Sequence, residues 1–223
     1  MNYYEKMEEN GGFCEVNTMK IYDISMEITE HMMVYKNKPE KKPKIQVMGD
    51  FTTGSSYESR ISMDLHTGTH IDMPLHMIQA GDSLDTFDIT KTITPCKVLD
   101  FTHVSSGITK EDLAVHSIHK DDFLLLKTKN SYVDFFDPNF IYLEKTGAVY
   151  LAERQIKGVG IDALGIERNQ PEHETHIQLL KEGIVILEGL RLAFIEAGDY
   201  FLYAVPLKIK GVEASPVRAF LTK

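Results

Sequence analysis

The chain contains no tryptophan, and only two cysteines, Cys14 and Cys96, occur in its 223 residues. Two cysteines cannot form the disulfide framework of a small secreted domain or a cysteine-based zinc site. The first twenty residues contain charges and two glycines but lack the apolar run of a signal peptide. No stretch approaches the roughly 18 apolar residues that would span a bilayer. We therefore expect a soluble, cytoplasmic protein without a membrane partner.

Positive charge is also scarce. The chain has 24 Lys and Arg against 33 Asp and Glu, which gives a formal net charge of −9. Nucleic-acid binding requires clustered Lys and Arg to neutralise phosphates. The one basic run, 38–44, also contains Glu40 and two prolines, which is typical of a solvated loop. We expect no nucleic-acid partner.

The signature of a serine hydrolase is missing as well. No GxSxG occurs in the chain, and the GSS at 54–56 lacks the second flanking glycine of that motif. The sequence therefore argues against a Ser-His-Asp hydrolase.

The remaining composition is that of one globular domain. Hydrophobic residues make up 43% and charged residues 26%, and the length suffices for a full hydrophobic core. The segment 1–18 is polar and includes Gly11 and Gly12, whereas Met19 opens MKIYDIS like a natural chain start. We predict a loosely ordered extension at 1–18 and a single domain at 19–223.

Short apolar, β-rich runs alternate with helical patterns along this domain. The predicted strands are 21–26, 45–47, 98–101, 123–127, 158–161, 184–187, 200–207 and 217–221. One predicted helix opens at Thr109 with Asp112 in a capping box, and others cover 148–157 and 171–182, the last ended by Gly183. Many strands and few helices indicate an α/β or α+β domain and leave its topology open.

The most informative stretch is HTGTHIDMPLH at 66–76, which contains three histidines and an aspartate but no Lys or Arg. A helix is disfavoured, because the proline alone costs about 3 kcal/mol in a helix interior. An extended backbone alternates its side chains. One face then carries three histidines and an aspartate, interrupted by a glycine and a proline: His66, Gly68, His70, Asp72, Pro74 and His76. The other face suits a core: Leu65, Ile71, Met73, Leu75 and Met77.

Such a face predicts a metal site. Neutral imidazole and carboxylate oxygens bind Zn²⁺ and similar ions at about 2.0–2.2 Å, and a cluster supplies most of the ligands at once. Gly68 leaves room for an ion or substrate, and Pro74 should take the chain out of the sheet. The alternative is that unrelated surface histidines lie together by chance.

HTGTHIDMPLH resembles the HxGTHxDxPxH signature of the cyclase-like metal hydrolase family, which includes bacterial kynurenine formamidases (arylformamidases). Similar segments are IYDIS at 21–25, GID at 160–162, VILEGL at 185–190 and PLKIKGVEASPVRA at 206–219. The resemblance covers the chain from Met19 onward. It implies an α/β fold of the swivelling β/β/α type, with a mixed central sheet or barrel-like core and few flanking helices. It also implies a homodimer or homotetramer.

The resemblance further assigns roles to individual residues. His66 and His70 would be metal ligands, Asp72 would bridge two metal ions, and His76 would be the general acid and base. A histidine on a later helix and a glutamate after the next strand complete the ligand set in the family.

The second half of this ligand set falls in PEHETHIQLLKEGIVILEGL at 171–190. Glu188 has the place of the glutamate, although it could also be the polar end of a buried strand. His176, twelve residues earlier, has the family separation. His173 lies one helical turn away on the same face and is the alternative ligand.

The expected function follows from the same resemblance. Two divalent ions, Zn²⁺ first and Mn²⁺ second, would activate a water that cleaves the C–N bond of a small aryl formamide such as N-formylkynurenine, a reaction of tryptophan catabolism. Family members often place a tryptophan against the substrate ring. This chain has none, and Tyr35, Phe51 and Tyr57 are either replacements or ordinary packed aromatics.

Three other functions are compatible with the sequence. One is an isatin hydrolase-like enzyme that opens another small cyclic amide or an ester. Another is an inactive metal- or ligand-binding protein, against which His76 argues, because a pure binding site needs no base. The third is a structural zinc domain, which would have four closed ligands and unfold on chelation.

Overall fold

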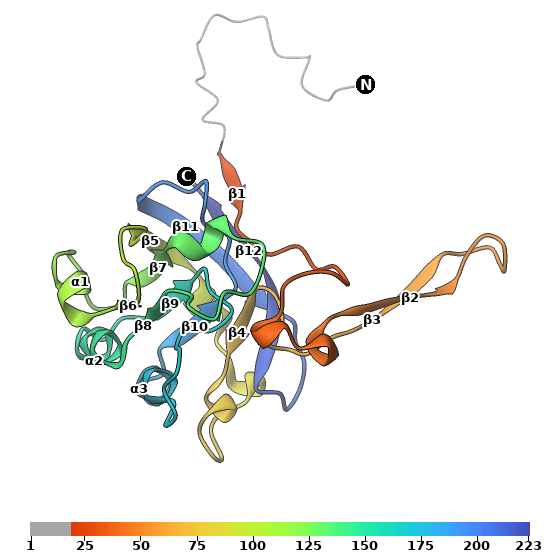
Figure 1. The fold of residues 1–223 in the computed structure, drawn as a ribbon. Coiled ribbons are helices and arrows are strands. Elements are labelled where there is room, and N and C mark those ends of the chain that lie inside the picture. Colours follow the sequence, from red (N-terminus) through yellow and green to blue (C-terminus); the bar gives the residue numbers. More distant parts are fainter. Residues whose placement is uncertain (1–18) are drawn as a thin grey trace, which may run out of the picture.

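A computed structural model describes residues 19–223, so the extension predicted at 1–18 lies outside the described residues. The described part contains twelve strands and three α-helices (Figure 1). The strands are β1 (Ile21–Asp23), β2 (Lys44–Gly49), β3 (Glu58–Ser62), β4 (His70–Asp72), β5 (Ile93–Asp100), β6 (Gly107–Ile108), β7 (Phe123–Lys127), β8 (Tyr142–Leu143), β9 (Gly158–Ile161), β10 (Val185–Glu188), β11 (Gly198–Pro206) and β12 (Ala214–Thr222). The helices are α1 (Lys110–Ala114), α2 (Lys145–Glu153) and α3 (Glu174–Lys181).

The main sheet closes on itself. Its seven strands follow the order β12-β11-β5-β7-β9-β10-β4, and β4 pairs again with β12, while β1 adds to another part of β12. Strands β5, β7, β9 and β10 run parallel, and the other pairings of this sheet are antiparallel. The prediction of an α/β fold with a mixed, barrel-like sheet and few helices is confirmed.

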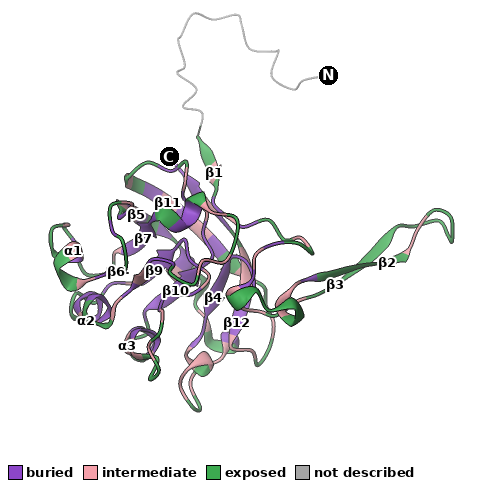
Figure 2. Cartoon of the chain, viewed as in Figure 1, coloured by how far each residue is buried: buried purple, intermediate pink, exposed green. Residues whose placement is uncertain are grey.

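The central strands are buried on both faces, which explains their apolar sequences. In β7, FLLLK, every residue is buried. Leu124 and Leu126 belong to the core beneath the helices, and Phe123 and Leu125 belong to the core on the other face. A run without polar alternation is typical of such parallel strands. The predicted bounds of β7 and β9 coincide with the observed ones, and burial colouring shows these strands inside the molecule (Figure 2).

The helices cover one face of the sheet, and their ends differ in part from the prediction. The capping box of α1 is present: the Asp112 N–H donates to Thr109 Oγ1 at 3.3 Å, and the Thr109 N–H donates to Asp112 Oδ2 at 2.8 Å. Helix α2 begins before the predicted residue 148, because Gly147 packs tightly against Leu143 and Ile108 instead of breaking the helix. No helix in residues 19–223 combines the length and apolarity needed to cross a bilayer.

Strands β2 and β3 form a two-stranded arm that projects from the rest of the molecule (Figures 1 and 2). The sequence predicted a strand at 45–47, but β3 was not predicted, because ESRIS lacks a run of β-forming residues. Ile45 and Ile61 face each other across the arm and are 43% and 53% exposed. The arm therefore presents an apolar surface to solvent.

Candidate metal centre

The donor-rich segment 66–76 is bent rather than continuously extended. Gly68 has a φ of +71°, in the left-handed region, and only His70–Asp72 forms a strand, β4. Pro74–His76 then forms a 3₁₀ turn with proline at its first position. The predicted alternation therefore holds only around β4. Ile71 and Met73 are buried as expected, whereas Leu75 is 37% exposed.

The bends nevertheless bring the predicted donors of this segment together. His66 Nδ1 lies 2.9 Å from Asp72 Oδ1, and His70 Nε2 lies 3.4 Å from the same oxygen. The 3₁₀ turn returns His76 toward the start of the segment, and its ring centroid lies 3.9 Å from that of His66. Two turns therefore achieve the convergence that was expected from one extended face.

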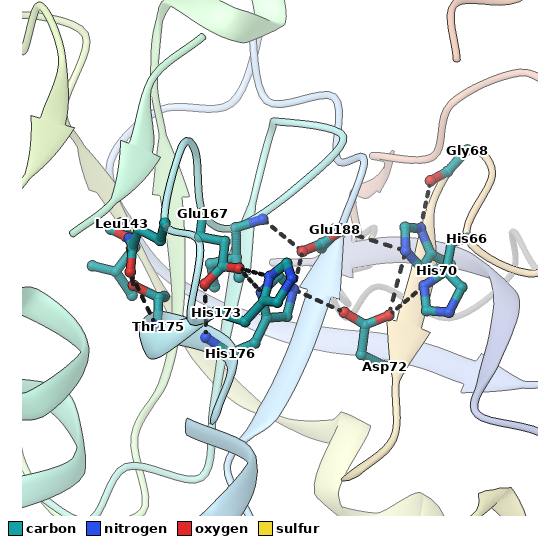
Figure 3. A network of polar contacts seen from close by, with 12 residues as sticks. His66, Gly68, His70, Asp72, Leu143, Glu167, His173, Thr175, His176 and Glu188 are labelled. Atoms are coloured by element: carbon teal, nitrogen blue, oxygen red, sulfur yellow. Dashed lines mark hydrogen bonds and ion pairs between the residues drawn. The ribbon is translucent and has the colours of Figure 1, made fainter. Parts of the chain in front are cut away.

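Two later elements complete the cluster (Figure 3). Strand β10 places Glu188 opposite His70 in antiparallel register, and Glu188 Oε2 lies 3.4 Å from His70 Nε2. Helix α3 contributes His176, whose Nε2 lies 3.3 Å from Glu188 Oε1 and 3.6 Å from Asp72 Oδ2. Residues separated by more than a hundred positions thus meet at one point of the closed sheet.

A close backbone approach holds the two donor-bearing regions together. Gly189 has a φ of +69°, and a Cβ at this position would lie 2.2 Å from the carbonyl oxygen of Gly68. Thr69 Oγ1 donates to the Gly189 carbonyl at 2.6 Å and accepts the Met26 N–H at 2.8 Å. Gly68, two residues before His70, and Gly189, next to Glu188, therefore allow this close backbone contact.

The buried carboxylates and imidazoles of the cluster shift one another's pKa values. Burial lowers the pKa of His70, but the Glu188 and Asp72 carboxylates outweigh burial and raise this pKa to about 9. Burial likewise opposes charge on His176, whose pKa is nonetheless raised well above its ordinary value by Asp72, Glu167 and Glu188. For Glu188, burial and the Asp72 charge raise the pKa, yet bonds from His176 and His70 bring it down to about 2.

The donor set fits divalent cations. Both carboxylate oxygens of Asp72 and Nε2 of His70 are buried without a hydrogen-bond partner. Asp72 Oδ1 lies only 2.9 Å from His66 Nδ1 and 3.4 Å from His70 Nε2, but neither approach has the geometry of a hydrogen bond. Lone pairs in this arrangement converge on the space between the side chains, as ligands do around an ion. Three groups of three donors each have their ligand atoms within 4.8 Å of one another in the described residues. Two of these groups share Asp72, namely His66, Asp72 and His76, and His70, Asp72 and Glu188, and the third consists of Glu167, His173 and His176.

His76 differs from the other histidines of the cluster. Burial lowers its pKa to about 4, because the opposing effect of the Asp72 charge is smaller. The ring is half-buried and lies beside those of His66 and His176, with centroids at 3.9 and 5.7 Å. A neutral imidazole next to the cluster can accept a proton at neutral pH.

Of the two histidines that compete for the later ligand position, the geometry favours His176. His176 is buried and its Nε2 faces the cluster. The side chain of His173 is 52% exposed, and its Nδ1 contacts Glu167 at 2.5 Å, on the far side from Asp72. His173 precedes α3 with a φ of +52°, so the shared helical face expected for the two histidines is not formed.

Two residues near the cluster were not singled out as site residues from the sequence. Glu167, in the loop after β9, is 6% exposed and contacts His176. Tyr35, considered only as a stacking surface, has its pKa raised by burial and then by the charges of Glu188 and Glu167. No motif marks Glu167. The other two stacking candidates, Phe51 and Tyr57, lie on the arm and are 76% and 59% exposed.

Comparison with known proteins identifies the family. Residues 22–168 match the family model described as putative cyclase. The chain belongs to the cyclase family. A kynurenine formamidase of Bacillus cereus (strain ATCC 10987 / NRS 248) is 34% identical over 171 residues, which are 76% of this chain and 81% of that protein.

Solved structures agree with this membership. The structure of a predicted metal-dependent hydrolase from Bacillus stearothermophilus is 50% identical, with a TM-score of 0.85 over 92% of this chain and 98% of that one. An isatin hydrolase bound to the product analogue thioisatinate shares the fold, with a TM-score of 0.81 at 20% identity over 92% of each chain. The cyclase-family chain described here is therefore a metal-dependent amidohydrolase.

Proposed function

We propose that this hydrolase cleaves the C–N amide bond of a small aryl formamide of the N-formylkynurenine type. The observation that carries the proposal is the position of His76, a half-buried imidazole beside two groups of donors that share Asp72. The similarity to a kynurenine formamidase supports the choice of substrate. Tyr35, whose ring packs against Phe136 and Phe140 at 5.3 and 6.4 Å, supplies an aromatic surface near the cluster.

The proposed ligands are His66, His70, Asp72, His176 and Glu188. They offer only nitrogen and oxygen, which suits Zn²⁺ first and Mn²⁺ second, and the shared Asp72 suits a pair of ions. When bound, such ions would polarise a carbonyl and can lower the pKa of a bound water to about 7.

In the proposed reaction, His76 accepts the proton of the water that attacks the formyl carbon. A C–O bond forms, and His76 then gives the proton to the leaving nitrogen as the C–N bond breaks. Formate and an aryl amine result. A base that is neutral at pH 7 is suited to the first of these transfers.

A hydrolysis screen tests this proposal. The metal-loaded protein is incubated with N-formylkynurenine, isatin and simple formanilides, and each product is quantified separately. Release of kynurenine and formate is the expected result. Opening of isatin without formamide cleavage would instead assign the isatin hydrolase-like reaction. No turnover of any of these substrates at full metal content would overturn the proposed substrate class.

The metal affinity is expected to rise with pH. A cation needs the lone pair of His70 Nε2, but this imidazole holds a proton up to a pH of about 9. Each proton that the metal must displace makes the apparent affinity change by about tenfold per pH unit below that pKa. Glu188, with a pKa of about 2, contributes nothing in this range. Chelator competition at pH 6.5, 7.5 and 8.5 measures the slope, and an affinity independent of pH would contradict it.

We also propose that the protein is a homodimer or homotetramer in which the β2–β3 arm packs on a second copy of the chain. An isolated two-stranded hairpin is marginally stable in water, and this one exposes Ile45, Val47 and Ile61 on one face. Replacing Ile45 and Ile61 together by Lys should yield monomers in light scattering. Gln46→Lys, on the opposite face, is the control and should leave the assembly unchanged. An intact oligomer in the double variant would exclude the arm as the contact.

A further inference from the structure

The carboxylate of Glu167 lies behind His176, on the side away from the cation ligands (Figure 3). Glu167 Oε1 is 3.1 Å from Nδ1 of His176, while Nε2 of the same ring faces Glu188 and Asp72. Both side chains are 6% exposed. The two nitrogens of one buried imidazole thus face two separate acidic environments.

We infer that Glu167 is a positioning residue for the metal centre. A carboxylate that accepts the Nδ1–H of an imidazole fixes its tautomer and its ring orientation, and leaves the Nε2 lone pair for the cation. Such an acceptor also makes the imidazole a stronger ligand. This inference rests on the proposed function, because it requires that His176 binds a metal ion.

Glu167 also fixes the backbone that carries this ligand. Its Oε2 accepts the N–H of His176 at 3.2 Å, in the first turn of α3. The residue before the helix, His173, provides no side-chain cap, so Glu167 satisfies a free N–H at the helix start from outside the helix. One oxygen of the Glu167 carboxylate therefore contacts the ring of His176, and the other accepts its backbone N–H.

His173 contacts the outer side of the same carboxylate, with Nδ1 at 2.5 Å from Glu167 Oε1. Glu167 thus lies between a half-exposed and a buried imidazole. This contact restricts the rotation of the Glu167 carboxylate. His173 therefore contacts Glu167 and is not one of the proposed metal ligands.

A structural role at the helix start and a role toward the metal can be separated, because the chain has a matched control. Gln170 Oε1 accepts the N–H of Thr175, the neighbour of His176, also at 3.2 Å. Gln170→Ala removes this bond, together with the other hydrogen bonds of Gln170 to Thr175 and Leu143, without touching the imidazole. Glu167→Ala removes both the backbone bond and the ring contact. Glu167→Gln keeps an acceptor for Nδ1–H but loses the charge.

The test is the Zn²⁺ affinity of each variant, measured by competition with a chromogenic chelator, together with thermal unfolding of the metal-free proteins. Glu167→Ala should bind Zn²⁺ about 10–100-fold more weakly than the wild type. Glu167→Gln should lose less affinity than Glu167→Ala. Gln170→Ala should unfold at a lower temperature yet keep the wild-type affinity.

Three results would overturn the inference. They are an unchanged affinity in Glu167→Ala, an equal loss in Gln170→Ala, and the loss of a whole equivalent of Zn²⁺ from Glu167→Ala at saturation, which would make Glu167 a ligand itself. Failure of the wild type to bind Zn²⁺ would be a different outcome, since it would overturn the proposed function and not only the role of Glu167.

Discussion

His76→Ala is expected to lower the kcat for formamide hydrolysis by about 10²–10⁴-fold, the usual contribution of a general acid and base. His76 has the low pKa of a neutral base and lies beside the donor groups. The proposed ligands Asp72 and Glu188 remain in place in this variant. The variant should therefore keep the metal content of the wild type. Steady-state kinetics and elemental analysis of the same preparation measure both quantities.

The control for this variant is His119→Ala. His119 is 69% exposed and contacts Asp122 just before β7, so its loss should change neither kcat nor metal content. If His76→Ala kept the wild-type kcat at equal metal content, His76 would have no part in the reaction. If it lost the metal, His76 would act as a ligand, as its place in one donor group allows.

Asp72→Asn is expected to abolish metal binding, and activity should fall to that of chelated protein. Asp72 is buried, belongs to both donor groups and lies within 3.6 Å of nitrogens from His66, His70 and His176. An amide has the same shape but carries no charge and only one oxygen, so it cannot serve two cations. Elemental analysis measures the metal, and circular dichroism shows whether the chain is folded.

Asp64→Asn provides the matched control, because it removes the same charge two residues before the donor-rich segment. Asp64 is 49% exposed and contacts Lys41 at 3.4 Å. This variant should retain metal and activity. An Asp72→Asn protein that still bound two equivalents of metal would show that the ions do not share this carboxylate. Chelated wild type that stayed folded would exclude a structural zinc domain.

The local sequence predicts an element correctly where a single physical requirement, such as burial or helix capping, determines which residues can occupy it. Strands β7 and β9 are buried on both faces, and their sequences consist almost entirely of residues that such burial demands. The capping box at Thr109 depends on two residues three positions apart. The donor-rich segment was recognisable because so many imidazoles and carboxylates without basic neighbours rarely serve a purely structural role.

Other features depend on partners far away in the chain and could not be predicted. The bend at Gly68 follows from its contact with Gly189, 121 positions later. Nothing near Glu167 distinguishes it from a surface glutamate until α3 packs over it. Helix α2 was placed too late because the tight packing of Gly147 against Ile108 is a tertiary contact.

The double pairing of β4 determines when the cation-binding side chains can meet during synthesis. On one edge β4 pairs with β10, and on the other edge Ala214 and Pro216 of β12 lie opposite Asp72 and His70. The segment 66–76 is therefore synthesised well before β10 and β12, the two strands that pair with β4. A nascent chain that lacks β12 has His66, His70 and Asp72 but only one of the two strands that flank β4, so this strand is held on both edges only after β12 has been made.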